Sequence, residues 1–211
     1  MTGKPRIPRA SAALPDSTVN DGSPRQQNGQ DGLAQDKALL RSHLKARRRA
    51  IDPVLKKAWD ERIAAQVLAW WQAHPHAALG VYWPLAGEPD LYPAYAEMAA
   101  AGVRLALPVV VERHAPLRFA EWIPGEATVT DQLGVAVPAA LRMVARPPAL
   151  LVPCLGFNAA GYRVGYGGGF YDRTLAPAPR PSTVGIAYAC QLVEFDGDAH
   201  DVPLDRVITE E

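Results

Sequence analysis

Cysteine is scarce in this 211-residue sequence, and neither sign of charge dominates it. Only Cys154 and Cys190 are present, so neither a disulfide framework nor a cysteine-based zinc site is expected. The chain has 22 lysine and arginine residues and 22 aspartate and glutamate residues, so its formal net charge is zero. This balance gives no overall electrostatic attraction to nucleic acid or acidic membranes. No apolar run approaches the ~18 residues of a membrane span, and the N-terminus lacks the apolar core of a secretory signal. These absences predict a cytoplasmic protein that binds neither nucleic acid nor membranes.

Hydrophobic residues make up 48% of the chain, which is enough for the core of one domain. They are rare in residues 1–35, where Pro, Ser, Gly, Gln and Asp predominate. Such a segment buries too little apolar surface to offset the entropy lost on ordering. We therefore expect a disordered tail over 1–35 and a single domain over 36–211.

Short apolar runs alternate with helical patterns across this domain, which predicts an α/β fold. The sheet should be mainly parallel, with helices on both faces. Helices are expected at 36–51, from Pro53 to about residue 74 with Asp52 as N-cap, and at 91–101, ending at Gly102. Strands are expected at 77–83, 103–111, 117–122, 149–152 and 183–189.

The most informative stretch follows the apolar run at 149–152, which Pro153 ends. A glycine-rich segment leads from there into a helical pattern that begins at Phe170. Strand, glycine loop and helix form a common phosphate cradle, because converging N–H groups and the helix N-terminus attract anions. Arg163 adds a positive charge, and Asp172 is a candidate ligand for a hard cation. A loop without a ligand is the alternative, but three consecutive glycines carry a large entropic cost in a purely structural turn.

The segment GYRVGYGGGFYDR at 161–173 resembles the signature of the 5-formyltetrahydrofolate cyclo-ligase family, also called 5,10-methenyltetrahydrofolate synthetases. The matching positions are Pro153, Phe157, Gly161, Arg163, Gly165, Gly167, Gly169, Tyr171, Asp172 and Arg173. The departures are Asn158 for Asp, Val164 for Leu and Phe170 for Tyr. The resemblance implies a single Rossmann-like three-layer domain and the ATP- and Mg²⁺-dependent conversion of 5-formyltetrahydrofolate to 5,10-methenyltetrahydrofolate.

The resemblance also implies an ATP site. Lys37 and Arg41 lie four residues apart, so they share a helix face. They match a K-x-x-x-R pair near the start of the family, which implies that they hold ATP phosphates. The implied ATP-binding positions are Lys37, Arg41, Arg163, Val164, Gly165, Tyr166, Gly167, Gly168, Gly169, Phe170 and Tyr171, with Arg163 and Asp172 as catalytic residues. For most basic residues of this helix, which also include Lys45, Arg47, Arg48 and Arg49, a solvated cationic face is the better interpretation. An RNA-binding helix is disfavoured by the neutral total charge.

The folate and metal positions are implied in the same way. Trp83 and Glu88 fall within a segment that matches the family pattern Y-x-P-x-x-x-E-x-D. A carboxylate suits the donors of a pterin ring, and an aromatic ring can stack on it. Without the resemblance, Glu88 would be taken as a solvated loop acid. The implied substrate-binding positions are Trp83, Glu88, Tyr166, Gly167, Gly168, Gly169 and Phe170, and the implied Mg²⁺ ligands are Asp172 and Asp201, with Asp205 as the alternative to Asp201.

Two other functions stay open at this stage. Asn158 and the absence of the family's acid in 135–140 suggest a protein that binds nucleotide or folate without turnover. A sugar-phosphate isomerase on a related fold would need a base near the glycine loop, and none is evident. We expect a monomer whose partners are small molecules.

Overall fold

The computed structural model describes the backbone of residues 25–211 and the side chains of residues 36–211. The chain divides into two units, residues 1–36 and 37–211. Helix α1 (Arg25–Arg49) begins before the predicted residue 36. Gln, Leu and Ala in residues 25–35 favour helix, and an existing helix extends at little cost. The expected disordered tail over 1–35 stays a prediction, and residues 1–24 lie outside the described residues.

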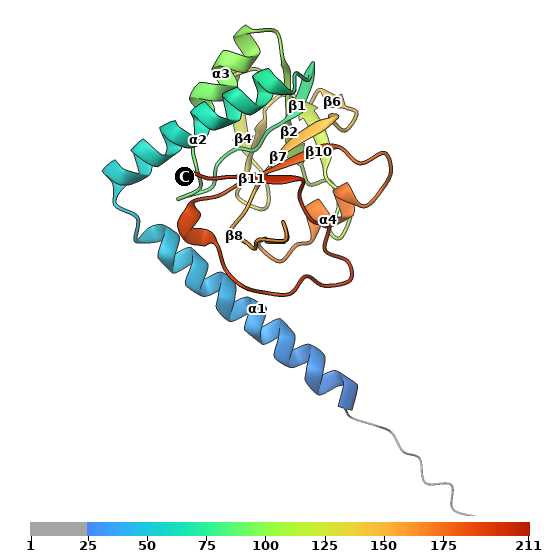
Figure 1. Ribbon diagram of the computed structural model, residues 1–211. Coiled ribbons are helices and arrows are strands. Elements are labelled where there is room, and N and C mark those ends of the chain that lie inside the picture. The colour runs from blue at the N-terminus through green and yellow to red at the C-terminus, as the bar shows by residue number, and fades with distance from the viewer. Residues whose placement is uncertain (1–24) are drawn as a thin grey trace, which may run out of the picture. The chain divides into compact units, whose positions relative to one another are not determined.

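The second unit is built on a seven-stranded sheet with the order β11-β10-β7-β1-β2-β3-β6 (Figure 1). The first five strands in this order are parallel, β3 is antiparallel to β2, and β6 is antiparallel to β3. The strands are β1 (Ala78–Gly80), β2 (Arg104–Val109), β3 (Arg118–Glu121), β6 (Met143–Val144), β7 (Ala149–Pro153), β10 (Ser182–Ile186) and β11 (Arg206–Ile208). Two small two-stranded sheets pair β4 (Thr128–Thr130) with β5 (Ala136–Pro138), and β8 (Gly156–Phe157) with β9 (Arg163–Val164). The predicted mainly parallel sheet is confirmed.

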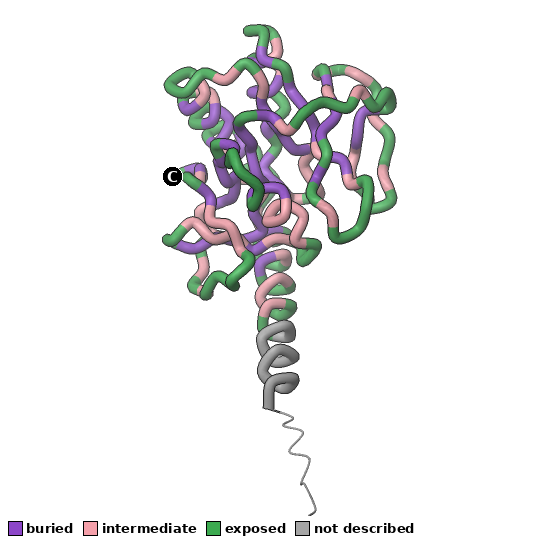
Figure 2. Tube along the Cα trace, turned by 90° about the vertical axis from the view of Figure 1, so that its right-hand side faces the viewer, coloured by how far each residue is buried: buried purple, intermediate pink, exposed green. Residues whose placement is uncertain are grey.

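Helices cover both faces of this sheet, as expected for a three-layer α/β domain. Side chains alternate along β7: Ala149 and Leu151 pack with α2 (Pro53–Ala73) and α3 (Tyr92–Ala100), whereas Leu150 and Val152 pack with Leu175 of α4 (Phe170–Leu175). A short 3₁₀ helix, η1 (Ala189–Gln191), follows β10. Burial of a strand on both faces explains its continuous apolar run. Figure 2 shows the buried residues gathered in the middle of the domain.

Local sequence signals account for the ends of the helices. The Asp52 carboxylate accepts hydrogen bonds from the N–H groups of Val54 (2.9 Å) and Leu55 (3.1 Å), which confirms the predicted N-cap of α2. Helix α3 ends just before Gly102, whose φ of +91° suits glycine. The expected boundaries of α2 and α3 are therefore close to the observed ones.

The strand order places a crevice between β1 and β7. The chain leaves β1 toward β2 on one side and leaves β7 toward β10 on the other. Open parallel sheets bind ligands outside the carboxyl ends of strands at such a switch point. The loops that follow β1 and β7 contain Glu88 and the glycine segment, so both meet at this edge.

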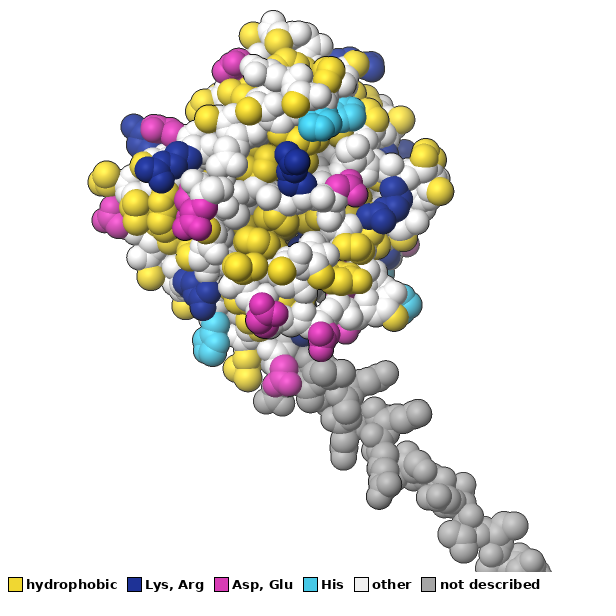
Figure 3. Space-filling model, in the orientation of Figure 1, with side chains coloured by type: hydrophobic (Ala, Val, Ile, Leu, Met, Phe, Trp, Pro, Cys, Tyr) yellow, Lys and Arg dark blue, Asp and Glu magenta, His cyan; other side chains and the backbone are white. Residues whose placement is uncertain are grey.

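Two further observations concern the surface. Basic and acidic side chains are interspersed on the face shown in Figure 3, with hydrophobic side chains between them. Over the part of the chain described, no helix is both long and apolar enough to cross a membrane.

Candidate active site

A cavity of about 610 Å³ lies at the carboxyl edge of β1 and β7. It is lined by every residue that the sequence assigned to a site: Lys37, Arg41, Trp83, Glu88, Arg163, Val164, Gly165, Tyr166, Gly167, Gly168, Gly169, Phe170, Tyr171, Asp172 and Asp201. A smaller cavity of about 180 Å³ adjoins the beginnings of β1, β2 and β7 and contains none of them. Because parallel sheets bind ligands at the carboxyl edge, the larger cavity is the candidate site.

The glycine loop is held against helix α1. The Arg41 Nε donates a hydrogen bond to the carbonyl of Gly165 (3.1 Å). Gly167 has φ +94°, and a Cβ there would lie 3.5 Å from Arg41 Cζ. Gly169 has φ +62° and precedes α4 as its N-cap. Left-handed backbone at these two positions explains why the loop needs glycine.

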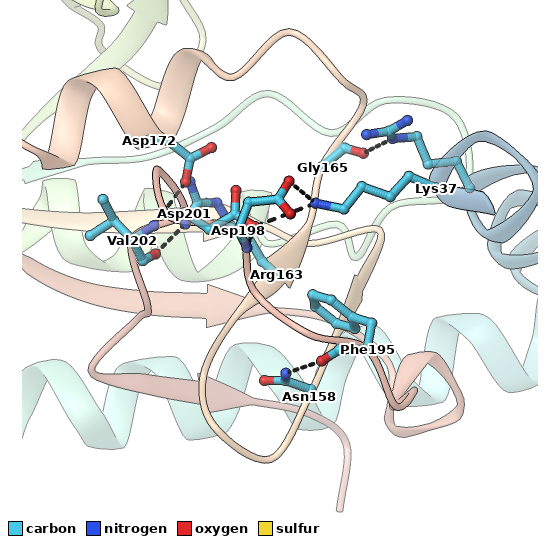
Figure 4. Close-up of polar contacts among 10 residues, drawn as sticks. Lys37, Asn158, Arg163, Gly165, Asp172, Phe195, Asp198, Asp201 and Val202 are labelled. Carbon is cyan, nitrogen blue, oxygen red and sulfur yellow. Dashed lines mark hydrogen bonds and ion pairs between the residues drawn. The ribbon is translucent and has the colours of Figure 1, made fainter. Parts of the chain in front are cut away.

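Lys37 lies four residues before Arg41 in α1, and its ammonium contacts two acids. Its ammonium forms an ion pair with Asp198 and lies 3.6 Å from the carboxylate of Asp201 (Figure 4). Asp198 lines the cavity but was not predicted. The clustering of Asp196, Asp198 and Asp201 in the sequence was the available signal.

Arg163 and Asp172 face each other within the cavity. Arg163 Nη2 donates to Asp172 Oδ1 (2.6 Å), and Nη1 donates to the carbonyl of Val202 (2.7 Å). The N–H of Val202 donates back to Asp172 Oδ1 (3.1 Å), which closes the cluster (Figure 4). The Arg163 side chain is only 5% exposed. Since a guanidinium has five N–H donors, others remain for a ligand after these bonds are made.

The carboxylates of Asp172 and Asp201 fit the requirements of a small hard cation. Asp172 contacts the residue next to Asp201, which brings the two loops together. In the described part of the chain, the hydrogen bonds to these acids use Oδ1 of Asp172 and Oδ2 of Asp201, so one oxygen of each remains. No group of three or more His, Cys, Asp or Glu residues able to hold a metal occurs among the described residues. Mg²⁺ commonly takes one or two carboxylates, with phosphate oxygens and water as its other ligands.

Asp205, the alternative to Asp201, forms hydrogen bonds with Thr183 outside the cavity. Its Oδ2 accepts hydrogen bonds from the N–H (2.7 Å) and the hydroxyl (3.0 Å) of Thr183. These bonds tie β10 to the turn before β11, and Asp205 does not line the cavity. The geometry therefore favours Asp201 as the partner of Asp172.

Glu88 lines the same cavity from the loop after β1, and it is 2% exposed, so its interpretation as a solvated loop acid is wrong. Its carboxylate accepts hydrogen bonds from the Leu85 N–H (2.8 Å) and the Tyr166 hydroxyl, and Arg48 Nη1 is 3.7 Å away. Burial raises the pKa of Glu88, although these three contacts oppose the rise. Trp83 is packed edge-on against Trp122, with ring centroids 5.7 Å apart.

Arg48 is the residue that the sequence interpretation misplaced. It was grouped with a solvated cationic face, but it is 7% exposed. Its spacing from Arg41 and from the buried Leu44 was the signal, because residues four and seven apart share a helix face.

Two of the departures from the family pattern, Asn158 and the missing acid in 135–140, can be examined in the structure. The Asn158 side-chain oxygen accepts hydrogen bonds from the N–H groups of Ala160 (3.1 Å) and Tyr162 (2.9 Å), and its amide donates to the carbonyl of Phe195 (2.9 Å). An amide oxygen forms such a turn as a carboxylate would. In the segment without the acid, Val135 lines the cavity and Val137 is buried in β5.

Comparison with known proteins agrees with the resemblance of the glycine motif. A sequence model of the 5-formyltetrahydrofolate cyclo-ligase family matches residues 33–210. The 5-formyltetrahydrofolate cyclo-ligase of Escherichia coli (strain K12) is 31% identical over 174 residues, covering 79% of this chain and 96% of that protein. The protein of the same name from Mycoplasma pneumoniae is 27% identical over 179 residues, covering 83% and 99%.

Solved structures give the same answer for the fold. A 5,10-methenyltetrahydrofolate synthetase from Mycoplasma pneumoniae matches with a TM-score of 0.70 and 25% identity, covering 83% of this chain and 99% of that one. The synthetase from Aquifex aeolicus matches with a TM-score of 0.67 and 26% identity, covering 83% and 90%. The predicted Rossmann-like α/β fold is therefore confirmed. The chain belongs to the 5-formyltetrahydrofolate cyclo-ligase family.

Proposed function

We propose that this chain uses ATP and Mg²⁺ to convert 5-formyltetrahydrofolate into 5,10-methenyltetrahydrofolate, with release of ADP and phosphate. One observation carries the proposal: a single cavity is lined by cationic side chains, by the glycine loop, and by a buried acid with an aromatic ring. Two substrates of different chemistry can therefore meet in it.

The phosphate groups of ATP belong on the side of α1 and the glycine loop. Lys37 and Arg41 supply positive charge from the helix, and Arg163 supplies it from β9. The loop from Gly165 to Gly169 can approach phosphate oxygens closely because it carries few side chains. Positioning and charge neutralisation are the main requirements for phosphoryl transfer.

The pterin ring of the folate belongs on the side of Glu88 and Trp83. A buried carboxylate accepts hydrogen bonds from the ring N–H groups, and water cannot compete with them there. The indole of Trp83 offers an apolar face to the ring. Asp172 and Asp201 would hold Mg²⁺, which neutralises phosphate charge when bound.

The chemistry requires no protein nucleophile. The formyl oxygen attacks the γ-phosphorus and ADP leaves, which turns a poor leaving group into a good one. N10 then attacks the formyl carbon and loses its proton, and phosphate departs with the former formyl oxygen. The cavity residues contribute by aligning the two substrates and by balancing the charge that moves to ADP.

The test is to mix the purified protein with Mg-ATP and 5-formyltetrahydrofolate and follow the absorbance of the methenyl product. We expect product only when protein, ATP, Mg²⁺ and folate are all present, with ADP formed in equal amount. Binding of both substrates without product would instead identify a binding protein, and product formed without ATP would contradict the proposed reaction.

A further inference from the structure

Arg48 of α1 joins two loops that line the cavity, the loop after β1 and the glycine loop. Its Nη2 donates hydrogen bonds to the hydroxyl of Tyr166 (2.8 Å) and to the carbonyl of Ala86 (3.3 Å), and its Nη1 lies 3.7 Å from Glu88 Oε1. Ala86 and Glu88 belong to the loop after β1, and Tyr166 belongs to the glycine loop. One guanidinium therefore connects a helix with both loops.

Tyr166 completes the connection. Its hydroxyl accepts from Arg48 and donates to Glu88 Oε1, while Glu88 Oε2 accepts from the N–H of Leu85. The Tyr166 ring also faces the ammonium of Lys45, which lies 5.4 Å from the ring centroid. Burial raises the pKa of the Tyr166 phenol, so it keeps the proton that it donates.

Arg48 also sets the charge balance around Glu88. Two ionisable side chains contact this carboxylate, Arg48 and Tyr166, and four more interact with it electrostatically: Tyr82, Tyr95, Cys154 and Tyr171. Burial raises the pKa of each phenol and of the thiol, so Arg48 is the member of this set that carries charge near neutral pH. A buried carboxylate without an opposing cation takes up a proton instead of remaining charged.

Arg48 acts from behind the site. Glu88 and Tyr166 line the cavity, whereas Arg48 does not. Arg41, two helical turns earlier on the same face of α1, bonds the carbonyl of Gly165 and does line the cavity. The helix thus contacts the glycine loop at two neighbouring residues, Gly165 and Tyr166.

We infer that Arg48 is a positioning residue: it holds Tyr166 and an ionised Glu88 in the arrangement that binds the folate, without touching the folate itself. The inference rests on the proposed function. It predicts an effect mainly on folate affinity, because the cations proposed for the ATP phosphates, Lys37, Arg41 and Arg163, are held by other contacts.

The test compares Arg48→Met with Arg49→Met, the same substitution at the exposed neighbour on α1. We expect R48M to raise the KM for 5-formyltetrahydrofolate at least about tenfold, since losing one partner of a buried charged contact typically weakens binding by that much. The KM for ATP should stay within about twofold of wild type. R49M should match wild type in both constants.

The pH dependence separates this role from a general loosening of the fold. Without Arg48 the pKa of Glu88 rises further, so the acid is more often protonated at neutral pH. Raising the pH from about 6 to about 9 should therefore reduce the ratio of the R48M to the wild-type folate KM. A ratio that does not change with pH, or equal rises of the folate and ATP KM, would overturn the inference.

A second pair of variants covers failure of R48M to fold. Arg48→Lys keeps the charge but lacks the planar guanidinium that bonds Tyr166 and Ala86 together, so we expect a smaller rise in folate KM than in R48M. Arg49→Lys is its control. The effect of R48K should shrink in a Tyr166→Phe background, because the two residues act through one hydroxyl. Additive effects of the two substitutions would contradict the inference.

Failure of the proposed function gives a different result. If wild type forms no methenyl product, folate affinity is measured directly by quenching of tryptophan fluorescence, to which Trp83 in the cavity should contribute. Weaker quenching in R48M than in R49M would still support the role of Arg48. Absence of folate binding by wild type would overturn both proposals.

Discussion

The ion pair of Arg163 and Asp172 joins two residues with different proposed roles. Arg163 is proposed to bind phosphate, and Asp172 is proposed to bind Mg²⁺. Oδ1 of Asp172 is occupied by Arg163 and by the N–H of Val202, and its other oxygen remains for a cation. Asp172→Asn keeps the size and an oxygen acceptor but removes the charge. We expect this variant to fold, to lose most turnover, and to need more Mg²⁺ for the activity that remains, as a titration of rate against Mg²⁺ would measure.

Asp205→Asn is the matched control, since Asp205 bonds Thr183 outside the cavity. Its Mg²⁺ dependence should equal that of wild type. A D172N variant with normal turnover and normal Mg²⁺ dependence would show that Asp172 only holds Arg163 in place.

Lys37 offers a cleaner test of phosphate binding than Arg163. Arg163 is buried against Asp172 and Val202, so its removal would also disturb the structure around it. The Lys37 side chain is 30% exposed, and exposed ion pairs add little to stability. We expect Lys37→Ala to leave the melting temperature almost unchanged and to raise the KM for ATP about tenfold, because a charge-assisted contact is lost.

Asp198→Asn serves as the comparison for K37A. It removes the acid that holds Lys37, so the ammonium becomes freer to meet a phosphate. The KM for ATP should then be unchanged or lower. Equal ATP constants in K37A and wild type would remove Lys37 from the phosphate site.

At the scale of elements, sequence patterns predicted those helices and strands whose position depends on neighbouring residues. The apolar run of β7 and the Asp52 cap of α2 were found because each depends on a few neighbouring residues. The start of α1 was missed, because polar residues such as Gln30 and Asp31 suggested disorder, whereas the helix extends from its packed end. The short hairpin of β8 and β9 was also not predicted, because two-residue strands carry almost no periodic signal.

The packing of α1 against this hairpin leads to a prediction about Gly156. A Cβ at Gly156 would come within 2.7 Å of Leu44 Cδ1 and 3.3 Å of the carbonyl of Gln191. Leu44 is 1% exposed, so it has little room to move. Gly156→Ala should destabilise the protein by about 1–3 kcal/mol, the usual cost of overfilling a packed core, as chemical denaturation would measure.

Gly165→Ala provides the stability control. Its φ is not in the left-handed region, and an added Cβ would meet nothing within 4 Å. Its unfolding free energy should match that of wild type. An equally stable G156A would mean that α1 shifts easily against the hairpin, which would also weaken the argument that α1 positions the loops.

At the scale of the whole molecule, the site is assembled from contacts between distant parts of the chain. Lys37 meets Asp198, and Arg48 meets Glu88 and Tyr166. The motif resemblance supplied residues that line one cavity, although their roles stay predictions. Asp198 and Arg48 were missed because their sequence signals, an acidic cluster and a helical spacing, are also common among surface charges. Their positions depend on how α1 packs against the rest of the domain.

The N-terminal boundary gives the last prediction. The family match begins at residue 33 and the second unit begins at Lys37. Among the side chains that the structure describes, none before Lys37 lines the cavity. Deleting residues 1–32 should therefore leave the melting temperature within a few degrees of wild type and both KM values within about twofold. A deletion of residues 1–37 takes Lys37 as well, so its ATP KM should rise as in K37A while the folate KM stays the same. Loss of activity already with the shorter deletion would show that residues before 33 support the site, because Lys37 is still present there.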